Sequence, residues 1–438
     1  MGSRFLETTI GDTCYVTDGA HAKVERLSDG ILYLTSKNIG VGKLLLDNVD
    51  YISEEDFGRL FSKTGKAQRR LEDGDVLTGI IGTFGNAYRY KSEDRFGVSS
   101  AVAVIRPNKG TLDSDFLLYV ITSPKFKATL AAYKSGSVQG YTNLPTIRRL
   151  PLTLPPIRVQ ECIAHILGTL DAKIELNRRM DETLESMAQA LFKSWFVDFD
   201  PVIDNALAAG NPIPEPLRAR AETRRALGDQ RKPLPDEIQK LFPDAFVFDD
   251  EMGWVPNSWN IKKWGEIATL EYGKSLKGYR DSVGSVRVWG TNGSIGWCDT
   301  PLCDSAGIII GRKGAYRGVH YSPDPFFVID TAFYLRPIYP FELKWAYYEL
   351  LKLDINGMDS GSAIPSTSRE DFYSIPVCVP PNAILEEFGN LLKDWCDKRY
   401  RNENGSEALT KLRDTLLPKL LSGELRIPDA EKLVAESL

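Results

Sequence analysis

Three short strings contain residues that enzymes use, and each lacks a part that its chemistry needs. Gly273-Lys274-Ser275 is similar to the end of a phosphate-binding loop, but Ala268 stands where such a loop has its first glycine. Asp324-Pro325-Phe326-Phe327 is similar to the Asp-Pro-Pro-Phe string of amino-methyltransferases, without its second proline and without a cofactor-binding FxGxG string. Pro235-Asp236 is not followed by the Glu-x-Lys of a nuclease metal site. We therefore expect no catalytic centre in this chain.

The cysteines and histidines form no metal-binding pattern. The 6 cysteines include no CxxC pair and the 3 histidines are scattered, which predicts reduced thiols and no bound metal or cofactor. No apolar run is long enough to cross a membrane, and the first residues lack the apolar core of a signal peptide. These features predict a cytoplasmic protein.

Side chains that suit phosphate binding are concentrated in three stretches, although the formal net charge is −5. Residues 57–71, 116–160 and 305–323 contain lysine and arginine but no acid. Basic runs are most often solvated faces. Three of them in an acidic chain favour localised contact with phosphate groups.

Loops bounded by glycine lie in or near these stretches, and they carry side chains that can pair with bases. Arginine and lysine can pair with guanine and asparagine or glutamine with adenine, while glycine lets the backbone approach a phosphate closely. The same loops also fit ordinary hairpin turns. The predicted DNA-contacting residues are Ser36, Asn38, Arg69, Arg70, Thr83, Arg89, Lys134, Ser137, Gln139, Tyr141, Asn143, Asn292, Ser294, Arg312, Lys313, Tyr316, Arg317 and Ser362.

A long helix over residues 156–198 must position these loops. Pro155-Pro156 predicts its start, and Phe199-Asp200-Pro201 predicts its end. Apolar residues recur between them with the 3.5-residue spacing of a helix that packs on a partner helix. The seam residues are Ile163, Leu167, Leu170, Ile174, Asn177, Asp181, Leu184, Ala188, Leu191 and Trp195.

The partner helix is predicted in the same chain, because the sequence repeats after a shift of 225 residues. Glu161, Leu167 and Asn177 then match Glu386, Leu392 and Asn402, and the match predicts a second helix over 381–423. Gly405 predicts a weak or kinked middle of that helix. The predicted helix-pair interface comprises Leu167, Leu170, Ile174, Asn177, Leu184, Leu191, Leu392, Trp395, Asn402, Leu409 and Leu416.

The repeat predicts two halves, each a globular part followed by a long helix. A two-fold relation between halves would place the helices antiparallel with a globular part at either end. Asn177 and Asn402 would then meet as a buried pair that fixes register, unless both are exposed in a frayed middle.

The remaining segments complete an α+β organisation with two mostly-β domains and a pseudo-two-fold repeat. Residues 1–155 show short strands with one helix over 114–133, and residues 258–380 repeat that order. A proline-rich linker is predicted over 199–257, with a short helix at 216–227, and a tail over 424–438.

Three strings carry a resemblance to a known family. LPPIRVQECIAHILGTLDAKIELNRRMDETLESMAQALFKSWFVDFDPV, LFPDAFVFDDEMGWVPNSW and LRDTLLPKLLSGELRIPDAEKL resemble segments of type I restriction-modification specificity (S) subunits. The resemblance implies two target recognition domains, at 1–155 and 258–380, that each bind half of a split, asymmetric site in double-stranded DNA. It also implies that two methyltransferase subunits, which carry S-adenosylmethionine, dock on the paired spacer helices. Restriction subunits are a further partner that it allows.

Two other classes of protein remain as alternatives. A self-contained methyltransferase or nuclease would need the incomplete strings described above to be working sites. A coiled-coil scaffold without a DNA role would leave the basic loops unexplained.

Overall fold

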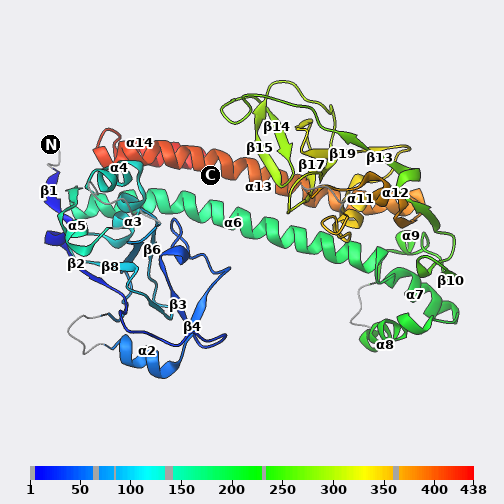
Figure 1. The fold of residues 1–438 in the computed structure, drawn as a ribbon, viewed down its shortest axis with the longest axis horizontal. Helices are drawn as coiled ribbons and strands as arrows, with labels where there is room; N and C mark the ends of the chain where they lie inside the picture. Colours follow the sequence, from blue (N-terminus) through cyan, green and yellow to red (C-terminus); the bar gives the residue numbers. More distant parts are fainter. Residues whose placement is uncertain (1–4, 63–68, 83–84, 134–141, 229–232, 359–364) are drawn as a thin grey trace. The chain divides into compact units, whose positions relative to one another are not determined.

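The computed structural model describes residues 5–62, 69–82, 85–133, 142–228, 233–358 and 365–438 (Figure 1). The chain divides into two compact units. Unit 1 comprises Met1–Arg179 and Asn402–Leu438, and unit 2 comprises Met180–Arg401. The long helices α6 (Ile157–Phe196) and α13 (Asn382–Ser422) each contribute one half to either unit.

Unit 1 is built from short strands and helices ahead of α6. In chain order these are β1 (Leu6–Thr9), α1 (Ile10–Thr13), β2 (Cys14–Asp18), β3 (Ile31–Leu34), β4 (Asp50–Ile52), α2 (Glu54–Leu60), β5 (Val76–Gly79), β6 (Ala87–Arg89), β7 (Phe96–Val98), β8 (Val102–Pro107), α3 (Ser114–Thr122), α4 (Pro124–Tyr133), α5 (Leu144–Arg149) and β9 (Pro151–Leu154); α14 (Ile427–Ala435) follows α13. The strands form sheets in the orders β2-β8-β5-β6, β4-β3-β7 and β1-β9.

Unit 2 repeats this sheet order with different strand lengths and loops. Its elements are α7 (Asp200–Ala209), α8 (Arg218–Leu227), α9 (Asp236–Gln239), β10 (Phe246–Asp249), β11 (Gly253–Pro256), β12 (Asn260–Lys263), α10 (Trp264–Ile267), β13 (Ala268–Tyr272), β14 (Val286–Gly290), β15 (Gly293–Cys298), β16 (Gly307–Gly311), β17 (Val319–Ser322), β18 (Phe326–Val328), β19 (Ala332–Pro337), α11 (Leu343–Leu351), α12 (Arg369–Ser374) and β20 (Pro376–Val379). The sheets β13-β19-β16-β17, β15-β14-β18 and β12-β20 correspond strand by strand to those of unit 1. The predicted α+β class and internal repeat are therefore confirmed.

The four-stranded sheet of each unit is buried on both faces. On β8, Ala103 and Ile105 pack in the core that contains α6, whereas Val102 and Val104 pack in the core beneath β3 and β7. The run Ile308-Ile309-Ile310 on β16 divides between two cores in the same way. Strands buried on both faces are expected to be continuously apolar.

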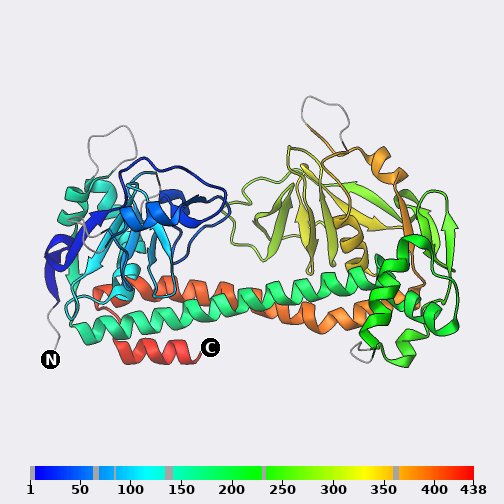
Figure 2. The same cartoon turned by 90° about the horizontal axis from the view of Figure 1, so that it is seen from below.

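Within each unit, half of α6 packs beside half of α13 (Figures 1 and 2). In unit 1, Leu167 and Leu170 share a core with Leu409 and Leu416. In unit 2, Leu392 is fully buried, and Leu191 and Trp395 pack partly buried against the same core. The predicted seam positions Ile174 and Leu184 are half-buried.

Several sequence predictions differ from the structure. The helix predicted over 114–133 is two helices, because Pro124 forces Ser123 into an extended conformation. Gly405 does not interrupt the second helix, since α13 is helical throughout Asn382–Ser422. The predicted linker contains α7, α8, α9 and a hairpin of β10 and β11 in its described residues. The Arg220 Nη2–Asp200 Oδ2 ion pair, 2.7 Å long, holds α8 against α7.

Candidate nucleic-acid interface

The glycine-bounded loop at 311–318 in unit 2 is held by hydrogen bonds from two threonines. The Thr367 hydroxyl donates to the Gly311 carbonyl at 2.8 Å, and the Thr367 N–H donates to the Arg312 carbonyl at 2.9 Å. The Thr291 hydroxyl lies 2.9 Å from the Lys313 carbonyl and 2.8 Å from the Thr331 carbonyl, as the donor to both. The Lys313 and Tyr316 side chains are exposed on this fixed backbone, Tyr316 to 78%.

The turn between β14 and β15 lies against the same loop. Thr291 belongs to this turn, and its carbonyl accepts a hydrogen bond from the Gly318 N–H at 3.1 Å. Gly293 has φ +121°, which a side chain would disfavour, and it lets the turn close in two residues. The predicted residues Asn292 and Ser294 are exposed here. The structure therefore brings the two predicted loops of unit 2 together.

Arg317 supports this loop from inside, which corrects its predicted role. Its side chain is only 4% exposed, and its Nη2 donates to the carbonyls of Ile355 and Asn356 at 3.2 and 2.7 Å. A guanidinium buried and bonded in this way cannot reach a DNA base or phosphate without leaving its site. Arg317 therefore braces the loop that presents Lys313 and Tyr316.

Ser36 and Asn38 of unit 1 were predicted to contact DNA, but both side chains are buried. The Asn38 Nδ2 donates to the carbonyls of Leu45 and Asn48 at 3.0 and 2.9 Å, and its Oδ1 accepts from the Thr35 N–H at 2.9 Å. These bonds fix a loop that follows β3. In this conformation the Asn38 amide is occupied by these bonds, which differs from the predicted DNA contact.

The predicted arginines of unit 1 differ in how far their charge is compensated. Arg89 lies 3.3 Å from both Asp73 and Asp115, so two carboxylates offset its charge. Arg69 lies 3.9 Å from Asp18, and Arg70 is exposed.

Asn143 is the N-cap of α5, although its side chain remains exposed. Its Oδ1 accepts a hydrogen bond from the Thr146 N–H at 2.8 Å, a role typical of asparagine at a helix start. The other predicted contacts, Thr83, Lys134, Ser137, Gln139, Tyr141 and Ser362, lie outside the described residues.

Tyr272 and Arg369, which lie beside the predicted residue Arg312 in unit 2, were not predicted from the sequence. The Arg312 guanidinium carbon lies 4.8 Å from the ring centroid of Tyr272, and that of Arg369 lies 5.2 Å from the same ring. The predicted contacts were sought in or near basic stretches without an acid. Arg369 lies outside such a stretch, because Glu370 and Asp371 follow it in sequence. Its position beside a tyrosine far away in the sequence is a tertiary feature.

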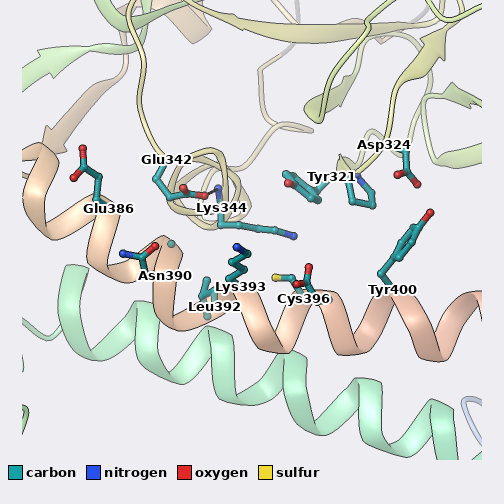
Figure 3. A pocket seen from close by; sticks show the side chains of 13 residues that line it. Tyr321, Asp324, Glu342, Lys344, Glu386, Asn390, Leu392, Lys393, Cys396 and Tyr400 are labelled. Carbon is teal, nitrogen blue, oxygen red and sulfur yellow. Dashed lines mark hydrogen bonds between the residues drawn. The ribbon is translucent and has the colours of Figure 1, made fainter.

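A groove of about 590 Å³ in unit 2 is lined by residues of α13, α11 and the end of β17 (Figure 3). Burial lowers the pKa of Lys344, whose Nζ lies 3.4 Å from the ring centroid of Tyr321. Glu386 and Asp397 lie on its α13 wall together with Lys393. Because the groove mixes both charges, it differs from the positive surface that phosphate binding needs.

The string Gly273-Lys274-Ser275, which is similar to the end of a phosphate-binding loop, lies in the segment that follows β13. A side chain at Gly273 would lie 2.1 Å from the Ile329 carbonyl, and the Lys274 N–H donates to the Val328 carbonyl at 2.9 Å, so the segment after β13 packs closely against the end of β18. Burial raises the pKa of Cys14 to about 12 and that of Cys303 to about 11, which keeps both thiols protonated.

Among the described residues, no cluster of His, Cys, Asp or Glu side chains could hold a metal ion. Nor does any described helix have the length and apolar character to span a membrane.

Known proteins share both the sequence pattern and the fold. Residues 33–186 match the family model of the type I restriction modification DNA specificity domain. The HindI specificity subunit of Haemophilus influenzae is 26% identical, over 82% of this chain and 88% of that protein. The MjaIX specificity subunit of Methanocaldococcus jannaschii is 23% identical, over 74% of this chain and 72% of its own.

A solved S subunit from M. genitalium has the same fold. It superposes with a TM-score of 0.59 at 17% identity and covers 96% of both chains. The family model, the relatives and the shared fold agree with the repeated architecture described above. In sequence and in fold, the chain is similar to type I restriction-modification specificity subunits.

Proposed function

We propose that this chain is the non-catalytic DNA-reading subunit of a type I restriction-modification complex. It binds a split, asymmetric site in double-stranded DNA, and each unit recognises one half-site. One observation carries this proposal: the two units share one sheet order, while their loops differ in length and in side chains. One fold with two unlike loop sets suits the recognition of two unlike sequences.

The methyl transfer itself belongs to partner subunits in this proposal. Two methyltransferase subunits dock on the helix pair of α6 and α13 and supply S-adenosylmethionine, and restriction subunits are a further partner that the resemblance allows. The incomplete enzyme-like strings in this chain support the assignment of catalysis to the partners.

Replacement of residues 258–380 by the equivalent domain of another specificity subunit tests the proposal. The complex with methyltransferase subunits is expressed, and the methylated positions of the host DNA are mapped. We expect one half-site to change while the other half-site and the gap stay the same. If both half-sites change, or if the purified chain alone transfers labelled methyl groups to DNA, the proposal fails.

A further inference from the structure

Two arginines contact one partly exposed tyrosine at an end of the β13-β19-β16-β17 sheet. Tyr272 is the last residue of β13 and is 49% exposed. The guanidinium carbons of Arg312 and Arg369 lie 4.8 and 5.2 Å from the centroid of its ring. Guanidinium groups are attracted to the face of an aromatic ring at such distances.

Both guanidinium groups are also held by hydrogen bonds. Arg312 donates from Nη1 to the Asp330 carbonyl at 2.9 Å. Arg369 donates from Nε and Nη2 to the Tyr373 hydroxyl oxygen at 3.2 and 2.8 Å, and that oxygen accepts the Leu270 N–H at 2.9 Å. The two positive charges are thus fixed to the sheet before any ligand binds.

Among the residues that the structure describes, no ion pair joins Arg312 or Arg369 to a carboxylate, although Glu370 and Asp371 follow Arg369 in sequence. In unit 1, by contrast, Arg106 pairs with Asp75 at 2.7 Å and with Glu72 at 3.0 Å. Two ordered guanidinium groups with aromatic neighbours therefore retain a net positive charge at the surface. An anion is the ligand that such a site binds.

The hydrogen bonds favour phosphate over a base as that anion. Specific pairing with guanine uses two donors of one arginine fork in a single plane. In Arg312 and Arg369 part of this fork is already engaged by Asp330 and Tyr373. The remaining donors can still contact a phosphate oxygen, which requires less exact alignment.

We propose that Tyr272, Arg312 and Arg369 form a phosphate clamp that positions the DNA backbone on unit 2. The proposal rests on the proposed function, because it takes double-stranded DNA as the ligand of this unit. The clamp contributes affinity and orientation, and the sequence preference of unit 2 comes from other side chains.

The test uses the chain assembled with its methyltransferase subunits and the variants Arg312→Gln and Arg369→Gln. Binding to a cognate duplex and to an unrelated duplex is titrated across a series of salt concentrations. Each variant should weaken binding to both duplexes by a similar factor, roughly tenfold, and lower the salt slope of log K by about 0.9. Arg369→Lys keeps the charge and should restore most of the slope, which separates the loss of charge from a folding defect.

Arg336→Gln is the matched control, because it also removes one positive charge from this sheet. Arg336 lies on β19 opposite Thr269, towards the start of β13, whereas Tyr272 is the last residue of β13. This variant should bind like the unaltered chain. Unchanged affinity and slope in both glutamine variants would overturn the clamp, as would a loss confined to the cognate duplex with altered methylation. Methylation by the unaltered complex separates the two proposals. If that complex methylates a split site, only the clamp is overturned by these outcomes; if it does not, the proposed function itself is overturned.

Discussion

Asn177 shows how a single polar residue contributes to the helix pair of unit 1. It is 6% exposed, and Asn402, its repeat equivalent, is 4% exposed. The Asn177 Nδ2 donates to the Asn402 carbonyl at 3.4 Å and to the Ser406 hydroxyl at 3.2 Å. The two asparagines therefore meet in the buried seam, and the alternative of two exposed residues in a frayed middle is excluded. A buried polar contact of this kind favours one register over its neighbours.

Asn177→Ala should destabilise the protein by about 1–2 kcal/mol, because it removes both buried hydrogen bonds and leaves the Ser406 hydroxyl without this donor. Urea denaturation of the full chain measures the change. Arg178→Ala is the control: Arg178 is exposed and its guanidinium donates to Glu175 one turn away, so about 0.5 kcal/mol or less is expected. Equal losses in the two variants would contradict a special role for Asn177.

The helix α13 shows how an element accommodates residues that its sequence pattern disfavours. Arg399 and Arg413 occupy seam positions, and each pairs with an acid of α6. Arg413 Nη1 lies 2.6 Å from Asp171 Oδ1 in unit 1, and Arg399 pairs with Glu185 in unit 2. These cross-helix ion pairs stand at seam positions where the pattern predicts apolar contacts, and the helix is continuous between them.

Gly405→Ala should stabilise the protein by about 0.5–1 kcal/mol, since alanine has the higher helix propensity. The added Cβ would meet only the Asn177 Nδ2, at 3.8 Å, which is an ordinary contact. Chemical denaturation of the full chain again provides the measurement.

Gly389→Ala is the matched control on the same helix. It gains the same propensity, but its Cβ would lie 2.6 Å from Oε2 of Glu342, whose Oε1 accepts the Lys344 N–H at the start of α11. A smaller gain or a loss is therefore expected. A destabilised Gly405→Ala variant would show that the glycine is needed for packing.

At the scale of the whole molecule, the lengths of α6 and α13 determine what the proposed DNA site can look like. The helices contain 40 and 41 residues, and each crosses from one unit into the other. At about 1.5 Å per residue, each is roughly 60 Å long. We infer that this pair sets the number of unread base pairs between the two half-sites.

Insertion of seven residues into both helices should lengthen that gap by about three base pairs. The insertions follow Asn177 in α6 and precede Asn402 in α13, so whole heptads pair and the seam is kept. Seven residues add roughly 10.5 Å of helix, and a base pair adds about 3.4 Å along DNA. Affinity should also fall, because three base pairs rotate the second half-site by more than a quarter of a turn of about 10.5 base pairs.

Methylation mapping of the assembled complex measures both the gap and the half-sites. Insertion into α6 alone serves as the control, because it leaves seven residues unpaired and should impair assembly. A gap of unchanged length in the double insertion would disprove the inference that the helix pair sets the number of unread base pairs.

The sequence by itself determined the long helices, the repeat and the α+β class, because these depend on local spacing. The heptad pattern from Ile163 to Trp195, the prolines at 155–156 and the match of Asn177 with Asn402 act within a few turns of helix or along the chain. Tertiary structure decided the roles of the loop residues. Arg312 and Arg317 stand five positions apart in one acid-free loop, yet only Arg317 is buried. Its guanidinium donates hydrogen bonds to the carbonyls of Ile355 and Asn356. Those partners, like the Tyr272 ring beside Arg312, come from distant segments, so the environment of each charge is set only when the chain packs.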